Sequence, residues 1–153
     1  MSAQTHAGPQ LRNLTEDECN DLLARNHVGR LAFSFHDAVD IRPIHYVFDA
    51  GWLYGRTSPG DKLITLRHNQ WIVFEVDEIA GELDWMSVIV RGTFYHTDPG
   101  GSVQDQAFHN RALAKIRTLN QRALTPTDPF AFRNEVFAIH IDSLTGKSSS
   151  TEA

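Results

Sequence analysis

A succession of strand-forming segments, joined by very short turns, restricts the fold of this 153-residue chain more than any other feature. From Val28 onward the sequence reads VGRLAFSFH, VDIRPIHYVFD and WLYGRT, and each segment is rich in β-branched and aromatic residues. The joints between them, HDA and DAG, are typical of tight turns. Because such short joints connect neighbouring strands that run in opposite directions, we expect an antiparallel meander.

Three further segments continue the pattern: QWIVFEVDE, DWMSVIVRGTFYHT and EVFAIHID. In the longest of them, alternation places Ser87 and Ile89 on one face and Val88 and Val90 on the other. Helical stretches are too few for repeated β-α-β units. We therefore predict an α+β fold, a mostly antiparallel six-stranded sheet that forms a small closed or half-closed barrel with flanking helices.

Capping residues and apolar spacing predict three helices, over residues 15–26, 58–68 and 103–122. The first begins with a capping box, Thr15-Glu-Asp-Glu18. The second begins at Ser58, a good N-cap that is followed by a proline at the first helical position.

Composition excludes several classes of protein. A formal charge of -5 offers no basic surface for nucleic acid, and the lone Cys19 allows no disulfide within the chain. The first residues lack a signal-peptide pattern, and no apolar run approaches the length that crosses a bilayer. We expect a soluble, cytoplasmic protein with no nucleic-acid or membrane partner. No metal-binding motif and no Ser-His-Asp or paired-carboxylate pattern is present either, so the residues indicate no catalytic group.

The segment YGRTSPGDK, residues 54–62, resembles a nucleotide-binding P-loop but does not match it. Asp61 separates the second glycine from Lys62, and no hydroxyl residue follows the lysine to hold a metal ion. As a helix start, however, the segment would place free amides, the hydroxyls of Thr57 and Ser58, and the Lys62 ammonium around one point, which suits a phosphate monoester. The residues alone leave this site and a plain helix start equally open.

Several segments, taken in order, resemble the pyridoxamine 5'-phosphate oxidase-like family of flavin-binding split β-barrels. They are GRLAF, RPIHYVF, LYGRTSPGDKLITLRHN, WIVFEVDE, WMSVIVRGTF and VFAIHIDSLTGKS. The similarity is greatest to the small branch that is related to nitroimidazole-resistance proteins. It implies a single FMN-binding split-barrel domain over residues 1–147. The end of the chain is small and polar, so we expect a flexible tail at residues 148–153.

The resemblance also implies a homodimer that binds two FMN molecules at the subunit interface. The family's phosphate-binding segment matches Thr57, Ser58 and Lys62. Its strand along the isoalloxazine ring matches Arg42, Pro43, Ile44 and His45. Its Trp-x-Ser-Val strand matches Trp85, Ser87 and Val88.

The family's oxidases of vitamin B6 carry an Arg-Lys pair at the phosphate and a basic substrate-binding C-terminus, and this chain has neither. The resemblance therefore favours an FMN-dependent oxidoreductase that acts on another small organic molecule, with a nicotinamide or other electron donor. A flavin enzyme needs no catalytic triad, because the cofactor carries the hydride or electrons. Alternatives are a split barrel that binds haem or the deazaflavin F420, a non-catalytic flavin-binding protein, and a flavin-free interaction module.

Overall fold

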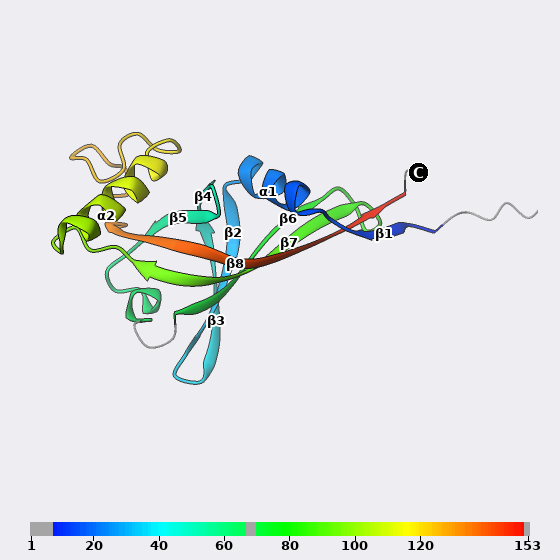
Figure 1. The fold of residues 1–153 in the computed structure, drawn as a ribbon, viewed down its shortest axis with the longest axis horizontal. Helices are drawn as coiled ribbons and strands as arrows, with labels where there is room; N and C mark the ends of the chain where they lie inside the picture. Colours follow the sequence, from blue (N-terminus) through cyan, green and yellow to red (C-terminus); the bar gives the residue numbers. More distant parts are fainter. Residues whose placement is uncertain (1–7, 67–69, 152–153) are drawn as a thin grey trace, which may run out of the picture.

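The computed structural model describes residues 8–66 and 70–151, and its dominant feature is one antiparallel sheet curled into a half-barrel (Figure 1). The strand order is β3-β2-β6-β7-β8-β5-β4, and β1 pairs with β8 beside this path. The strands are β1 Gln10–Asn13, β2 Val28–Phe35, β3 Ala38–His45, β4 Val47–Asp49, β5 Trp52–Thr57, β6 Trp71–Ile79, β7 Trp85–His96 and β8 Glu135–Ser150. The helices are α1 Glu16–Arg25, the short 3-10 helix η1 Lys62–Thr65, and α2 Val103–Ile116. The predicted α+β fold with a mostly antiparallel sheet is confirmed.

The sheet has eight strands rather than the predicted six. One addition is β1, and the other arises because the predicted second strand is divided between β3 and β4 at Tyr46. Tyr46 leaves the ladder because its backbone N–H bonds to the carbonyl of His27 and its buried hydroxyl bonds to the carbonyl of Leu23 at 2.6 Å. Both partners lie far back in the chain, at the end of α1 and just after it.

Helix α1 fills the inside of the half-barrel. It begins as predicted with a capping box, in which the N–H of Glu18 bonds to the Thr15 hydroxyl and the Glu18 carboxylate accepts from the N–H of Thr15. Its buried face presents Leu22 and Leu23, both 0% exposed, to the main core. Complete burial of two leucines stabilises the fold by about 4 kcal/mol. Helix α1 is therefore part of the main core of the half-barrel.

Helix α2 covers the opposite, outer surface of the sheet at its other end, over β5 and β8 (Figure 1). Here Val136 and Ala138 of β8 are buried beneath Ala112 and Ile116 of α2, while the alternate residue Phe137 faces the main core. This part of β8 is therefore buried on both faces. The helix ends at Ile116 rather than at residue 122, and a series of turns follows as far as residue 134.

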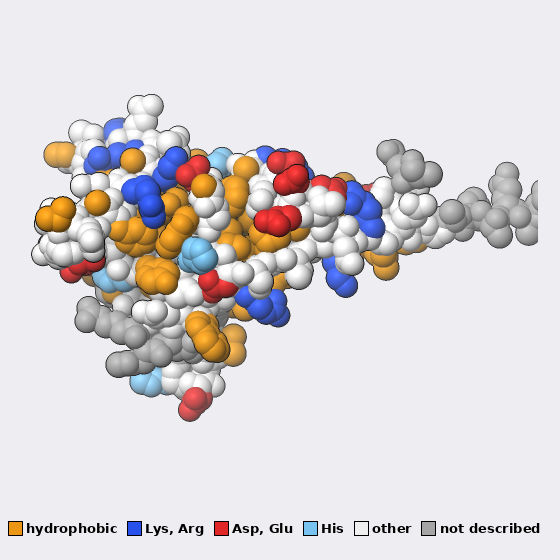
Figure 2. Space-filling model, in the orientation of Figure 1, with side chains coloured by type: hydrophobic (Ala, Val, Ile, Leu, Met, Phe, Trp, Pro, Cys, Tyr) orange, Lys and Arg blue, Asp and Glu red, His pale blue; other side chains and the backbone are white. Residues whose placement is uncertain are grey.

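The strands extend beyond the body of the molecule as an arm, made by β1, the end of β6, the start of β7 and the end of β8 (Figure 1). Charged side chains of both signs lie along the arm, whereas hydrophobic ones gather over the body (Figure 2). The predicted flexible tail is wrong for residues 148–150, which pair with β1 and β7 within the arm. Ser148 and Ser149 are buried there, and the Ser149 hydroxyl bonds to the carbonyl of Leu83. The prediction for residues 152 and 153 lies outside the part of the chain that the structure describes.

A β-bulge between Arg91 and Gly92 shifts the register of β7 against β8. A Cβ atom on Gly92 would lie 2.5 Å from the carbonyl oxygen of His140, so the bulge requires glycine. Within residues 8–66 and 70–151, the helices are all too short or too polar to cross a membrane.

Candidate functional site

The expected phosphate-binding segment is organised around the carboxylate of Asp61. This carboxylate accepts hydrogen bonds from the Thr57 hydroxyl at 2.9 Å, the Arg42 Nε at 2.9 Å and the backbone N–H of Leu63 at 3.0 Å. Burial acts to raise the pKa of Asp61, but these hydrogen bonds outweigh it and hold the pKa below its ordinary value. Asp61 is therefore a charged structural centre for this corner of the molecule.

The helix predicted to begin at Ser58 is wrong where the structure describes it. The helical turn is η1, and its N-cap is Asp61 rather than Ser58, because the Asp61 side chain captures the first free amide, that of Leu63. Residues 58–60 form an extended and turning link before it. The last residues of the predicted helix, 67 and 68, lie outside the described part.

The two cations of this corner both face carboxylates. The Arg42 guanidinium also lies 3.6 Å from Asp40, and the Lys62 ammonium lies 3.8 Å from the same carboxylate. The Lys62 side chain is 56% exposed, so its long contact with Asp40 is easily exchanged for another anion. Arg42 is held more firmly, between Asp61 and the ring of Phe33.

These contacts divide the expected phosphate ligands into two kinds. The Thr57 hydroxyl and the Arg42 Nε both donate to the Asp61 carboxylate. These two residues therefore stabilise the segment and are already engaged in bonds within the protein. The half-buried Ser58 hydroxyl makes no hydrogen bond to any residue in the described ranges, and Lys62 is at the surface. A hydroxyl donor beside an exposed ammonium fits a phosphate monoester, and Ser58 and Lys62 are the residues that would hold it.

The expected ring-binding residues fall on two faces of the sheet. Directly paired residues on neighbouring strands share a face of the sheet. One such row crosses four strands and consists of Pro43, Arg30, Glu75 and Ile89. By alternation, His45 shares the outward face of Pro43, while Trp85 and Ser87 share that of Ile89. All four expected contacts therefore lie on one outward face.

The other three expected residues of these strands point inward. Ile44 is 9% exposed and Val88 is 0% exposed, and both belong to the main core. Their side chains are covered, so only their backbone is available to a ligand. Arg42 turns inward to Asp61, as described above.

A single chain does not bring the two outward pairs together. Pro43 and the start of β7 are separated by three strand spacings across the sheet and by four residues along β7. With about 4.8 Å between strands and about 3.3 Å per residue, Pro43 and Trp85 are roughly 20 Å apart. His45 and Ser87 lie in one row of the sheet and are roughly 14 Å apart. One flavin ring on one chain cannot contact both.

Next to the end of β3 is a cavity of about 510 Å³, between β4, β5, α2 and the turns that follow α2. His45 and Tyr46 form its border with β3, and Ile116 and Phe130 contribute to its apolar walls. The volume is that of a small-molecule site. Sequence reasoning did not find this cavity, because its walls come from four separate parts of the chain.

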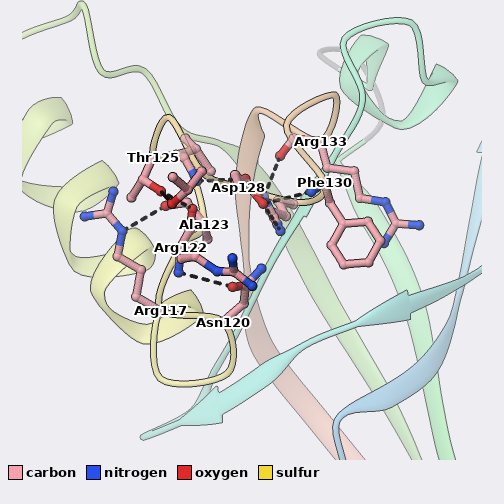
Figure 3. Close-up of polar contacts among 11 residues, drawn as sticks. Arg117, Asn120, Arg122, Ala123, Thr125, Asp128, Phe130 and Arg133 are labelled. Atoms are coloured by element: carbon pink, nitrogen blue, oxygen red, sulfur yellow. Dashed lines mark hydrogen bonds and ion pairs between the residues drawn. The ribbon is translucent and has the colours of Figure 1, made fainter.

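A buried ion pair fixes the turns that form one wall (Figure 3). Both nitrogens at the end of Arg56 donate to Asp128, whose side chain is 1% exposed. The backbone N–H groups of Leu124 and Phe130 also donate to this carboxylate, at 2.9 and 3.0 Å. The bond from Arg56, together with these backbone bonds, holds the pKa of Asp128 well below its ordinary range. The only local signal for this centre is the turn sequence TPTDPF.

The outward face also carries a pair of carboxylic acids, Glu75 and Asp77. Burial, a hydrogen bond to Asp77 and repulsion between the two charges raise the pKa of Glu75 to about 7, although Arg30 lies 3.4 Å away. In the described ranges, no group of three or more potential ligands is arranged to hold a metal ion.

Comparison with known proteins identifies the family. Residues 15–148 match the family model for pyridoxamine 5'-phosphate oxidase, and the chain belongs to this family. An uncharacterised protein from Rhizobium meliloti is 25% identical over 144 residues, which is 91% of this chain and 95% of that protein.

Solved structures agree on the fold. A FAD-binding protein from Mesorhizobium loti has a TM-score of 0.71 and 24% identity, over 94% of this chain and 99% of that one. The FAD-binding protein from Mycobacterium smegmatis has a TM-score of 0.63 and 25% identity, over 90% of this chain and 98% of that one. The predicted split β-barrel is therefore confirmed.

Proposed function

We propose that this protein is a flavin-dependent oxidoreductase that acts as a homodimer, with FMN, or the FMN portion of FAD, at the subunit interface. The observation that carries the proposal is the placement of Pro43 and His45 on the same outward face as Trp85 and Ser87, at separations of about 14 to 20 Å. Two copies that pack through this face bring the arm of one beside the ring-binding strand of the other, which completes the site. The naming of the Mycobacterium smegmatis relative as FAD-binding supports a flavin.

In this proposal the residues of the chain bind and orient the cofactor. Ser58 and Lys62 hold the phosphate, and Asp61 keeps Thr57 and Arg42 in place behind them. The outer edge of β3 borders the ring, and the partner copy supplies Trp85 and Ser87 at the other side. A bound flavin would supply hydride or electron transfer between a nicotinamide or other donor and a small organic acceptor.

The first test is a visible absorption spectrum of the purified protein, followed by mass analysis of what denaturation releases. We expect an oxidised-flavin spectrum and the mass of FMN or FAD. A Soret band, or the mass of a deazaflavin, would replace the flavin by haem or F420. A colourless protein that does not bind added FMN or FAD would refute the proposal.

The second test addresses the phosphate. Lys62→Ala should weaken FMN binding about tenfold, because one charge-assisted contact is lost, with the apo fold unchanged. Lys115→Ala is the matched control, since Lys115 is a surface lysine of α2 that pairs with Asp49 at 3.3 Å, away from the corner. Equal affinity of the two variants, measured by fluorescence titration, would exclude Lys62 from the site.

The third test addresses the shared interface. If two copies complete the site, dilution that dissociates the dimer should release the flavin over the same concentration range. Sedimentation velocity followed at a flavin wavelength and a protein wavelength measures both. A monomer that keeps its flavin at full affinity would contradict the shared site.

A further inference from the structure

The cavity beside β3 combines apolar walls with two arginines, of which one is paired with a carboxylate and the other is not. Arg56 at its floor is neutralised by Asp128, to which it donates two hydrogen bonds. Arg133 at its wall has no carboxylate within ion-pair distance among residues 8–66 and 70–151. Figure 3 shows the Arg133 side chain extending away from Asp128, alongside the Phe130 ring. The cavity therefore carries one positive charge in excess.

The rings beside Arg133 hold its guanidinium in place. Its central carbon lies 5.5 Å from the centroid of Phe130 and 5.6 Å from that of Phe132. Contacts with ring faces orient a guanidinium but leave its N–H groups available, because aromatic rings accept hydrogen bonds only weakly. The group is thus positioned and still able to bind an anion.

A second polar residue, Tyr54, lines the same cavity. Tyr54 is 2% exposed, and its hydroxyl makes no hydrogen bond to any described residue. Every fully enclosed side-chain polar atom of the described residues does have a partner, so this hydroxyl is not fully enclosed. Since Tyr54 lines the cavity, the cavity is where its hydroxyl finds a partner.

We propose that this cavity binds a small, largely apolar organic acid, whose carboxylate pairs with Arg133 and whose second polar atom, where it has one, meets the Tyr54 hydroxyl. A single unneutralised guanidinium favours a monoanion over a doubly charged phosphate. The apolar lining, to which Ile116, Leu119 and Phe130 contribute, favours a hydrocarbon or aromatic body. Because His45 belongs both to this cavity and to the proposed ring-binding strand, the bound acid lies where a flavin substrate is needed; this role, but not the binding itself, rests on the proposed function.

The test uses benzoate, cinnamate and 1-naphthoate as probes, each against its primary amide, titrated into the purified protein by calorimetry. We expect at least one acid to bind about tenfold or more tightly than its amide, which has nearly the same shape but no charge. Arg133→Gln should abolish that preference. Arg122→Gln is the matched control, because Arg122 is exposed in the same series of turns and does not line the cavity.

Tyr54→Phe removes only the hydroxyl. It should weaken binding of 4-hydroxybenzoate, which carries a second polar atom, about threefold to tenfold, and leave benzoate binding and the preference for the acid nearly unchanged. Thermal unfolding of every variant without ligand shows whether the fold is intact. Three results would overturn the proposal: equal binding of acid and amide, equal loss in the Arg122 and Arg133 variants, or tighter binding of phenyl phosphate than of benzoate.

The absorption spectrum of the same sample separates this inference from the proposed function. A flavin-loaded protein that ignores all three acids refutes the cavity proposal alone. A colourless protein that prefers acids through Arg133 refutes the flavin and leaves the cavity as a binding site.

Discussion

Replacing Asp128 by asparagine tests whether one buried carboxylate organises the wall of the cavity. In the wild type this carboxylate accepts two bonds from Arg56 and two from backbone N–H groups, with its side chain 1% exposed. The amide of Asp128→Asn keeps the shape but has no charge and only one acceptor atom. At least two of the four bonds are therefore lost or weakened, and Arg56, with a side chain 10% exposed, is left without a counter-charge.

We expect the free energy of unfolding to fall by about 3 kcal/mol. Breaking a buried ion pair by removal of one partner costs about 3–5 kcal/mol, and access of cavity water to Arg56 places the result near the lower end. For a domain of this size the melting temperature should fall by about 6–12 °C. Urea unfolding followed by tryptophan fluorescence, and calorimetry, measure the two quantities.

Asp49→Asn is the control, because Asp49 forms an ion pair with Lys115 of α2 in the same region, but both side chains are exposed, at 46% and 37%. Its loss should cost less than about 1 kcal/mol. The pKa of Asp128 is lowered in the folded state, so its stabilisation is complete above its ordinary pKa and is lost as the pH falls below about 4. The difference between Asp128→Asn and wild type should therefore narrow in acid. Equal costs for the two variants at pH 7 would refute the reasoning.

Two further predictions concern the sheet. Glu75 has a folded-state pKa of about 7, above its unfolded value, so the wild type should lose stability as the pH rises from about 4.5 to about 7. Glu75→Gln should remove this dependence of stability on pH. In urea unfolding at pH 8 the variant should be about 1–2 kcal/mol more stable than wild type, a figure that allows for solvent screening. A variant less stable than wild type at pH 8 would contradict the raised pKa of Glu75. Gly92→Ala should cost about 2–3 kcal/mol in the same assay, because its Cβ would lie 2.5 Å from the His140 carbonyl oxygen, whereas Gly81→Ala, with nothing within 4 Å, should be nearly neutral. Similar losses for the two glycine variants would show that the bulge tolerates a side chain.

Features encoded by neighbouring residues were predictable from the sequence. The capping box at Thr15 and the alternation of Ser87 and Val88 depend on contacts a few residues apart, and the structure has both. The helix at Ser58 was wrong because two signals competed within one segment. Serine and proline favour a start at residue 58, but the Asp61 carboxylate bonds the amide of Leu63 and starts the turn later.

Features that depend on distant partners were not predictable. The break at Tyr46 follows from a hydrogen bond to the Leu23 carbonyl, and nothing near Tyr46 in the sequence indicates it. The same holds for the candidate site. Ser58 and Lys62 could be proposed from local sequence, but the bond from Arg42 to Asp61 spans 19 residues and that from Arg56 to Asp128 spans 72. Arg133 lies near β3 only because the fold brings four separate parts of the chain together around the cavity. Nothing near Arg133 in the sequence indicates this position.

Strand β8 limits how this protein can change in evolution. At one end it lies between the core and α2, and at the other it is held between β1 and β7 in the arm. At the bulge opposite Arg91 and Gly92, β8 already carries one extra residue. Elsewhere in the strand an insertion or deletion of one residue would turn the side chains beyond that point to the opposite face, so that Phe137 and Ala138 would exchange environments. Descendants of this chain should therefore vary in length at exposed turns such as residues 80–84, and keep the length of β8 fixed.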